Sequence, residues 1–171
     1  MDYITAPKQV EAVYRRARGI NDSPYTLLPG QASLFADDEF VGATKIEITP
    51  PQGQIEIFLG VDDRIKIERE FIRRDVDKRV VSGRRRIFYG YEIRLENLLT
   101  ELAQVTIYDK MPVPRHEYVK VKLDFTDPKP IAQENMNMLT WEMSQKAGEL
   151  RAISFVFSVE YPQAMELVGL H

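Results

Sequence analysis

The chain has 171 residues, contains no cysteine and carries a formal net charge of -3 at pH 7. Without cysteine there is no disulfide scaffold, thiolate metal site or thiol nucleophile, and the slightly acidic balance gives no bulk attraction to nucleic acid or anionic lipid. No apolar run approaches the roughly 20 residues of a membrane span, and the N-terminus lacks the apolar core of a signal peptide. We therefore expect a soluble chain without nucleic-acid binding or membrane insertion, from a parent protein in the cytoplasm or the cell envelope.

The first patterned segment is "VEAVYRRA", in which Val10, Val13, Tyr14 and Ala17 follow the i, i+3, i+4, i+7 spacing of a helix face. This spacing alone predicts a short amphipathic helix. A segment this short is also open to tertiary contacts, which override local preference where they supply better partners.

Three adjacent acidic residues, Asp37, Asp38 and Glu39, stand in "SLFADDEFVG" between the apolar pairs Leu34-Phe35 and Phe40-Val41. Short polar residues between two apolar runs predict the tip of a hairpin. A metal site is the alternative, but neighbouring strand residues point to opposite faces and the spacing of a calcium loop is absent. The same argument predicts a turn at "GVDDR", residues 60–64.

The segment from Arg64 to Arg86 is the most charged part of the chain, and its basic residues outnumber its acidic ones. The pattern predicts two strands joined near Val80 to Gly83, which form a long ribbon. Aromatic residues follow directly, as a surface for a single nucleic-acid strand or a polysaccharide requires. We favour a simpler interpretation, in which the charges keep the ribbon solvated and block edge-to-edge pairing. The residues that we assign to binding are Arg73, Arg74, Arg84, Arg85, Arg86 and Tyr89.

Alternation of apolar and polar residues dominates the rest of the chain, in "YEIRLEN", "YVKVKLDF" and "AISFVFSVEY". It predicts strands with one solvent-exposed face, as in antiparallel sheets. In "YVKVKLDF" the alternation places Phe125 on the same face as Val119, Val121 and Leu123. Glycine and proline punctuate these runs often enough to suggest a sandwich or barrel. "PQAMELVG", which starts at Pro162, is a weak candidate for a C-terminal helix, and the state of "IAQENMNM", residues 131–138, stays open.

We recognise no catalytic motif in the sequence. The two histidines, His116 in "MPVPRHE" and the terminal His171, cannot form the paired ligands of a metallohydrolase helix. No nucleophile elbow, Walker loop or dinucleotide-binding turn is present in the sequence. We expect no catalytic residue, no metal and no cofactor. Trp141 shares a face with Leu139 and Met143 and is predicted to be a core residue; a sugar platform is the alternative and requires an exposed ring.

The succession of several motifs resembles one family. The motifs are "YITAPK", "TLLPGQASLFADDEFVG", "IEIFLGVDDRIKIER", "YGYEIRLENL", "VTIYDKMPVPRHE", "LTWEM" and "FVFSVEYP". In this order they resemble the C-terminal domain, of unknown function, of the mucoidy inhibitor A-like family. The resemblance implies a strand rather than a helix over Val10 to Ala17, and a chain excised from a longer protein. It carries no established catalytic residues, and the family name points toward exopolysaccharide and the cell envelope.

We therefore predict an all-β fold of antiparallel strands in two sandwich-like lobes. Residues 1–80 form the first lobe, whose opening strands we expect upstream of Met1, and residues 84–171 form an immunoglobulin-like sandwich. The ribbon joins them. The predicted core of the second lobe consists of Tyr91, Ile93, Leu95, Val105, Ile107, Val119, Val121, Leu123, Trp141, Ile153, Phe155, Phe157 and Val159.

Three functional hypotheses follow. The first is a non-catalytic module of a larger bacterial protein that binds a protein partner or another copy of itself through strand edges or the ribbon. The second is polysaccharide binding, in which Phe88, Tyr89, Tyr91 and Trp141 would supply the aromatic surface. An enzyme ranks last, because a site made only of carboxylates is indistinguishable from surface charge in a sequence.

Overall fold

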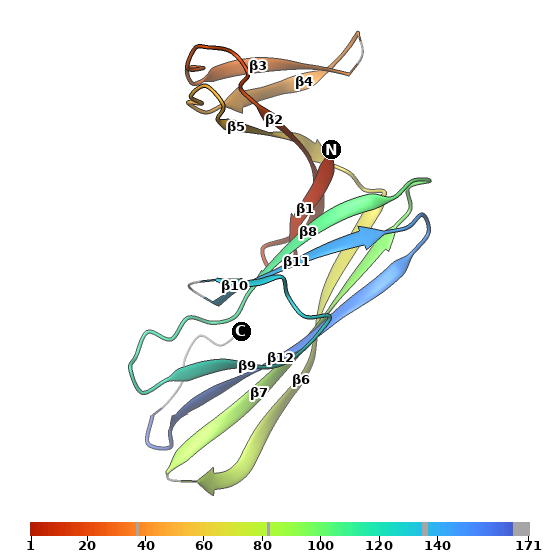
Figure 1. The fold of residues 1–171 in the computed structure, drawn as a ribbon. Coiled ribbons are helices and arrows are strands. Elements are labelled where there is room, and N and C mark those ends of the chain that lie inside the picture. The colour runs from red at the N-terminus through yellow and green to blue at the C-terminus, as the bar shows by residue number, and fades with distance from the viewer. Residues whose placement is uncertain (37, 82, 135–136, 166–171) are drawn as a thin grey trace.

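The computed structural model describes residues 1–36, 38–81, 83–134 and 137–165, and within them the chain forms β-strands and no α-helix (Figure 1). The strands are β1 (Asp2–Ala6), β2 (Val10–Ile20), β3 (Gly30–Ala36), β4 (Glu39–Ile46), β5 (Gln54–Val61), β6 (Ile65–Val81), β7 (Arg84–Asn97), β8 (Ala103–Lys110), β9 (Lys120–Asp127), β10 (Ala132–Glu134), β11 (Met138–Gln145) and β12 (Leu150–Pro162). The predicted all-β class is confirmed. Residues 166–169 of the C-terminal helix candidate lie outside the described residues.

The strands form three sheets. A six-stranded sheet has the order β10-β11-β8-β1-β2-β5, a four-stranded sheet has the order β6-β7-β12-β9, and β3 pairs with β4 alone. The pairs within each sheet are antiparallel except β1 with β8, which runs parallel. The expected antiparallel sheets are therefore present, with one parallel pair between strands that are far apart in the sequence.

The segment from Val10 to Ala17 is a strand, part of β2, and not the helix that its spacing alone indicates. It pairs with β1 on one side and with β5 on the other. Val13 points into the core and is 1% exposed, whereas Val10 is 50% exposed. β1 pairs with the first part of β2, up to Arg16, and β5 with the later part, from Tyr14 on. This pairing outweighs a weak helical pattern.

The two large sheets pack face to face over one hydrophobic core. Trp141 of β11 meets Phe155 of β12 with ring centroids 5.8 Å apart, which joins the six-stranded to the four-stranded sheet. Of the predicted core, nine residues are buried and four, Tyr91, Val119, Val121 and Leu123, are partly buried against the same cluster. Residues from outside the predicted second lobe also enter it: Tyr3, Val13, Ile65 and Ile67.

The sheet order does not follow the predicted division into residues 1–80 and 84–171. The six-stranded sheet combines β1, β2 and β5 with β8, β10 and β11, because β1 inserts between β2 and β8. The predicted boundary falls at the turn between β6 and β7, which are neighbours in one sheet. A cut there passes through both sheets.

The hairpin β3–β4 projects from the sandwich together with the outer ends of β2 and β5 (Figure 1). We call this part, described for residues 20–36 and 38–58, the arm. Phe35 pairs with Phe40 at its tip, with Asp38 in the turn, so the acidic corner turns the chain as predicted, although Asp37 lies outside the described residues. At the base of the arm, the Asn21 side chain donates to the carbonyls of Tyr25, at 2.9 Å, and Thr49, at 3.1 Å.

Candidate functional site

The basic ribbon is the pair β6–β7, in which Ile65 lies opposite Asn97 and Val81 opposite Arg84, with register shifts between Phe71 and Arg73 and between Asp77 and Val81. Gly83 has a φ of 69°, a backbone conformation that suits glycine at this turn. A bulge between Phe71 and Arg73 inserts Ile72 as an extra residue. Past the bulge the alternation changes phase, so Phe71 and Arg74 face inward while Arg73 faces outward beside Gly90.

The structure divides the residues that the sequence assigns to binding between two faces of this sheet. Arg73, Arg84 and Arg86 lie on the outer face by strand alternation, and each is paired with a carboxylate: Asp75, Glu160 and Asp124 respectively. Arg74 and Arg85 lie on the opposite face. At these three described positions the outer face of the ribbon therefore carries paired charges.

Tyr89, the aromatic member of that set, lies in the core. It is 5% exposed, and its ring stacks on Phe157 with centroids 5.3 Å apart. Trp141 is also buried, at 1% exposed, and its indole Nε1 donates to the Pro128 carbonyl at 3.0 Å. The core prediction for Trp141 is confirmed, and neither ring is available as a stacking platform.

The outer face of the four-stranded sheet carries an apolar groove of about 530 Å³. All four strands contribute to it: Ile72 of β6, Phe88 and Gly90 of β7, Val156 of β12 and Phe125 of β9. Arg73, Glu92, Asp124 and Ser154 also line it. The outer face of an antiparallel sheet is usually solvated and polar, so the apolar side chains gathered here make this face the candidate binding surface. We call it the outer groove.

Two irregularities in strand pairing bring apolar side chains to the outer groove. The bulge in β6 presents Ile72, and a second register shift, between Val156 and Phe157, places Phe125 opposite Val156 on the outer face. The sequence prediction that Phe125 shares the inner face of Val121 and Leu123 is therefore wrong, since it assumed unbroken alternation. Phe125 is 53% exposed, as is Ile72.

Polar groups frame the outer groove. The Arg86 guanidinium lies over the Phe88 ring, 4.8 Å from its centroid, and also pairs with Asp124. Gly90 lines the groove without a side chain, and a Cβ at this position would stand 3.0 Å from Cγ of Arg73. Arg73 is 60% exposed and borders the apolar floor.

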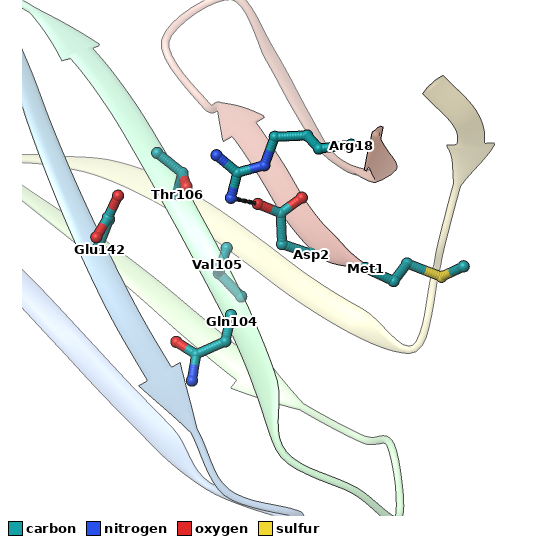
Figure 2. A pocket seen from close by; sticks show the side chains of 7 residues that line it. All are labelled: Met1, Asp2, Arg18, Gln104, Val105, Thr106 and Glu142. Carbon is teal, nitrogen blue, oxygen red and sulfur yellow. Dashed lines mark hydrogen bonds and ion pairs between the residues drawn. The ribbon is translucent and has the colours of Figure 1, made fainter. Parts of the chain in front are cut away.

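A second, polar cavity of about 310 Å³ lies on the outer face of the six-stranded sheet (Figure 2). Asp2 of β1 and Arg18 of β2 form an ion pair within it, and Thr106 of β8 and Glu142 of β11 lie on its opposite side. Asp2 also accepts hydrogen bonds from Nε and Nη2 of the buried Arg16, at 3.1 and 2.9 Å.

The charges of Asp2 and Arg18 in this polar cavity are paired within the fold. Burial alone raises the pKa of Asp2, but the hydrogen bonds and charges of Arg16 and Arg18 outweigh burial and lower that pKa below its ordinary value. Arg16 pairs in addition with Glu56 of β5, at 3.2 Å. An ionised Asp2 held in this way ties β1 to β2 and is not poised to give up or take a proton.

Other predicted positions agree with the structure. His116 is exposed in a loop, where its Nδ1 accepts a hydrogen bond from the Tyr118 backbone at 3.3 Å. Asp62 accepts from the Arg64 guanidinium at 2.7 and 2.8 Å, which closes the predicted turn. In the described part of the chain, no three acidic or histidine side chains gather as a metal site would need, and no helix is long and apolar enough to span a membrane.

Comparisons with known proteins match the chain to a nematode protein and to one protein family. It is 23% identical over 176 residues to "Protein F37C4.5" of Caenorhabditis elegans; the match covers 96% of the chain and 32% of the nematode protein. The chain thus spans about a third of that relative's length. No solved structure matches it. A family described as "Domain of unknown function (DUF4139)" matches residues 6–163, which is nearly the whole chain, and the chain therefore belongs to this family.

Proposed function

We propose that the chain is a non-catalytic protein-binding module that holds its partner in the outer groove. The single observation that carries this proposal is the apolar lining of a sheet face that would otherwise be solvated. The larger protein in which it works is, we infer, a bacterial member of the mucoidy inhibitor A-like family with a role at the cell envelope. The succession of motifs from "YITAPK" to "FVFSVEYP" supports this parentage.

An immunoglobulin-like arrangement of the part from β7 to β12 belongs to the same proposal. Trp141 lies buried between the two large sheets and packs on Phe155, which resembles the position of the central tryptophan in such sandwiches. This part alternates between the sheets, with β7, β9 and β12 in one and β8, β10 and β11 in the other. Sandwiches of this kind often serve as binding scaffolds, although the fold alone does not assign the role.

The outer groove suits apolar side chains of a protein. Its volume lies within the roughly 300–1,000 Å³ of sites that enclose a ligand, and burying the half-exposed Ile72 and Phe125 would drive association through the hydrophobic effect. Arg73 and Asp124 at the rim supply charges of both signs, which set the orientation of a partner.

Most of the aromatic residues that the sequence suggests for polysaccharide binding are not available on the surface of this structure. Trp141 and Tyr89 are buried, and Tyr91 stacks on Phe155 with ring centroids 5.5 Å apart. Phe88 is the one member of that predicted set on the outer face, and the Arg86 guanidinium covers its ring. A lone covered ring is a poor sugar platform, so we favour the protein partner.

Site-specific photo-crosslinking in the full-length protein, expressed in its own cells, tests the proposal. A photoreactive residue at Ile72 or Phe125 should give discrete protein adducts, and the same residue at Ile131, which is 60% exposed outside the outer groove, should not. Adding Phe88→Asp should abolish the adducts, because a buried carboxylate opposes apolar contact. Absence of protein adducts from both groove positions, or equal labelling at Ile131, contradicts the proposal.

A further inference from the structure

The polar cavity on the outer face of the six-stranded sheet has one carboxylate that the fold leaves unpaired. Glu142 of β11 lines the cavity and is exposed, and within the described residues it forms no ion pair or hydrogen bond. On the other side of the cavity, the Asp2 carboxylate already accepts hydrogen bonds from Arg16 and Arg18. Glu142 is therefore the carboxylate that this cavity offers to a ligand.

Thr106 of β8 is a second group in the cavity without a partner. It lies opposite Glu142 on the neighbouring strand, lines the cavity and is only 7% exposed. In the part of the chain that the structure describes, its hydroxyl group has no hydrogen-bond partner. A polar group this enclosed normally has one. The Thr106 hydroxyl is thus a place where a ligand can complete a hydrogen bond.

The side of the cavity away from Glu142 carries unused hydrogen-bond donors. The Arg18 side chain is 57% exposed, and only one of the N–H groups of its guanidinium donates to Asp2. Gln104 accepts the Ser144 hydroxyl through Oε1 at 2.7 Å, so the N–H groups of its amide remain free among the described residues. Both Arg18 and Gln104 line the cavity. Their donors suit an anionic oxygen, for which a guanidinium is the strongest side-chain partner.

The acceptors and the donors face one another across the sheet. Glu142 and Thr106 belong to the neighbouring strands β11 and β8, and Arg18 belongs to β2, beyond β1. Figure 2 shows Thr106 between the Glu142 carboxylate and the Arg18 guanidinium. The cavity volume of about 310 Å³ is at the lower end of the range for ligand sites. A ligand that satisfies both sides must therefore be small and carry a cationic donor and an anionic acceptor.

We infer that the polar cavity binds a small zwitterion of the amino-acid class, with its ammonium group on Glu142 and Thr106 and its carboxylate group on Arg18 and Gln104. Each charged group of the ligand then meets side chains of the complementary hydrogen-bonding type. A phosphate group, with its higher negative charge, is less suitable in a cavity that also contains Asp2 and Glu142. The cavity lies on a different sheet from the outer groove, so the inference goes beyond the proposed function and does not depend on it.

Two-dimensional proton–nitrogen NMR on the 171-residue chain tests the inference. The probes are glycine, β-alanine, γ-aminobutyrate and ε-aminocaproate, which carry the same two charged groups at increasing separation. At least one of them should shift the amide signals of Thr106 and Glu142 in a saturable way, with a Kd of about 1 mM, as the small number of ligand atoms allows. n-Butylamine and butyrate should bind about tenfold more weakly or less, because each makes only one of the two charged contacts.

Substitutions at the two ends of the cavity should have different effects on the probes. Glu142→Gln should weaken the best-binding amino acid by about tenfold or more and leave the binding of butyrate unchanged. Arg18→Gln should weaken that amino acid by a similar factor and leave the binding of n-butylamine unchanged. The Arg18 variant should fold as the wild type does, since its side chain is more than half exposed and Arg16 still holds Asp2.

Thr106→Val separates binding from stability. Valine keeps the shape of threonine but lacks the hydroxyl group, so binding of the amino acid should weaken. The free energy of unfolding should stay the same or rise, because the hydroxyl makes no hydrogen bond within the described residues. Glu117→Gln, the same exchange as Glu142→Gln at an exposed loop residue, is the matched control and should bind as the wild type does.

Three outcomes would overturn the inference. The first is that none of the four amino acids gives saturable shifts around the cavity up to about 50 mM, a concentration at which a millimolar site is almost full. The second is that n-butylamine binds as tightly as the amino acids and Arg18→Gln has no effect, which would mean a site for cations alone. The third is that Glu117→Gln weakens binding as much as Glu142→Gln, which would assign the effect to general surface charge. Crosslinking at Ile72 and Phe125 is unaffected by any of these results, so the proposed function is tested separately.

Discussion

Arg69 of β6 and Asp109 of β8 form an ion pair across the interior that joins the four-stranded to the six-stranded sheet. Arg69 Nε lies 2.7 Å from Asp109 Oδ2, and the two side chains are only 13% and 0% exposed. The guanidinium also lies over the Tyr91 ring, 3.9 Å from its centroid, and the backbone N–H of Arg69 donates to the Glu11 carboxylate at 2.7 Å. A charged contact thus occupies one edge of an otherwise apolar core.

Removing one partner of this pair should destabilise the fold strongly. Asp109→Ala leaves the Arg69 charge buried without its carboxylate, and a broken buried pair costs about 3–5 kcal/mol. Urea unfolding followed by tryptophan fluorescence measures this directly, because Trp141 is buried between the same two sheets. The double variant Arg69→Met/Asp109→Leu should recover most of the loss, since it removes both charges and keeps the volume.

The pair Arg73–Asp75 is the matched control for that experiment. Its atoms lie 3.4 Å apart and its side chains are 60% and 59% exposed. Asp75→Ala should change the free energy of unfolding by less than about 0.5 kcal/mol, because exposed ion pairs are screened by solvent. Equal effects of Asp75→Ala and Asp109→Ala on the free energy of unfolding would mean that the buried pair between the sheets does not stabilise the fold more than an exposed pair.

Truncating aromatic residues on the two faces of the four-stranded sheet should have different effects on the free energy of unfolding. Phe155 and Phe157 are 1% and 4% exposed, so replacing either by Ala should cost about 3–5 kcal/mol. Phe125, on the same sheet but 53% exposed, should cost less than about 1 kcal/mol on the same change. A cost within about 0.5 kcal/mol for Phe155 or Phe157 would exclude that residue from the core.

Alternation predicts which residues pack, as long as each strand is unbroken. It places Trp141 correctly, because Leu139 and Met143 share its inward face. It misplaces Phe125, since a register shift near Val156 depends on the partner strand and leaves no mark in a single sequence. The outer groove needs that shift and the bulge at Ile72, so it could not be predicted.

Long-range pairing is the other feature that local patterns miss. β1 lies next to β8 although about a hundred residues separate them, and this parallel pair connects the two predicted lobes. Arg69 stands at an inward position between Ile67 and Phe71, an exception to the apolar pattern that signals a buried charge. Its partner, Asp109, belongs to another strand, and only the folded structure brings the two together.

Gly90 offers a test of the outer groove that leaves the fold intact. Gly90→Ala should change the free energy of unfolding little, because Ala has less freedom to lose in a strand, whereas the Arg73 side chain, whose Cγ would stand 3.0 Å from the new Cβ, must shift by a few tenths of an ångström. The added methyl group narrows the groove floor, so crosslinking from a photoreactive residue at Ile72 should fall. Unchanged crosslinking in a variant of normal stability would mean that the partner does not enter the groove.

The turn between β5 and β6 links stability to acid pH through Asp62. This residue is 6% exposed, and Arg64 donates to both of its carboxylate oxygens. The hydrogen bond from Arg64 lowers the pKa of Asp62 below its ordinary value of 3.8, and outweighs burial, which acts in the opposite direction. A carboxyl group whose pKa is lower in the folded than in the unfolded state stabilises the fold above the unfolded pKa, and this stabilisation is lost as the pH falls through the folded pKa.

Asp62→Asn should therefore make the free energy of unfolding depend less on pH in the acid range. The Asn side chain cannot ionise, so the variant should be less stable than the wild type at neutral pH. The difference should shrink as the pH falls from 3.8, the ordinary pKa of the group, through the lower pKa of the folded state. Urea unfolding at a series of pH values between about 6 and 2 measures both curves. Asp63→Asn, a change at the exposed neighbouring residue, should leave the curve as in the wild type. Parallel curves for Asp62→Asn and the wild type would show that this turn contributes nothing to acid unfolding.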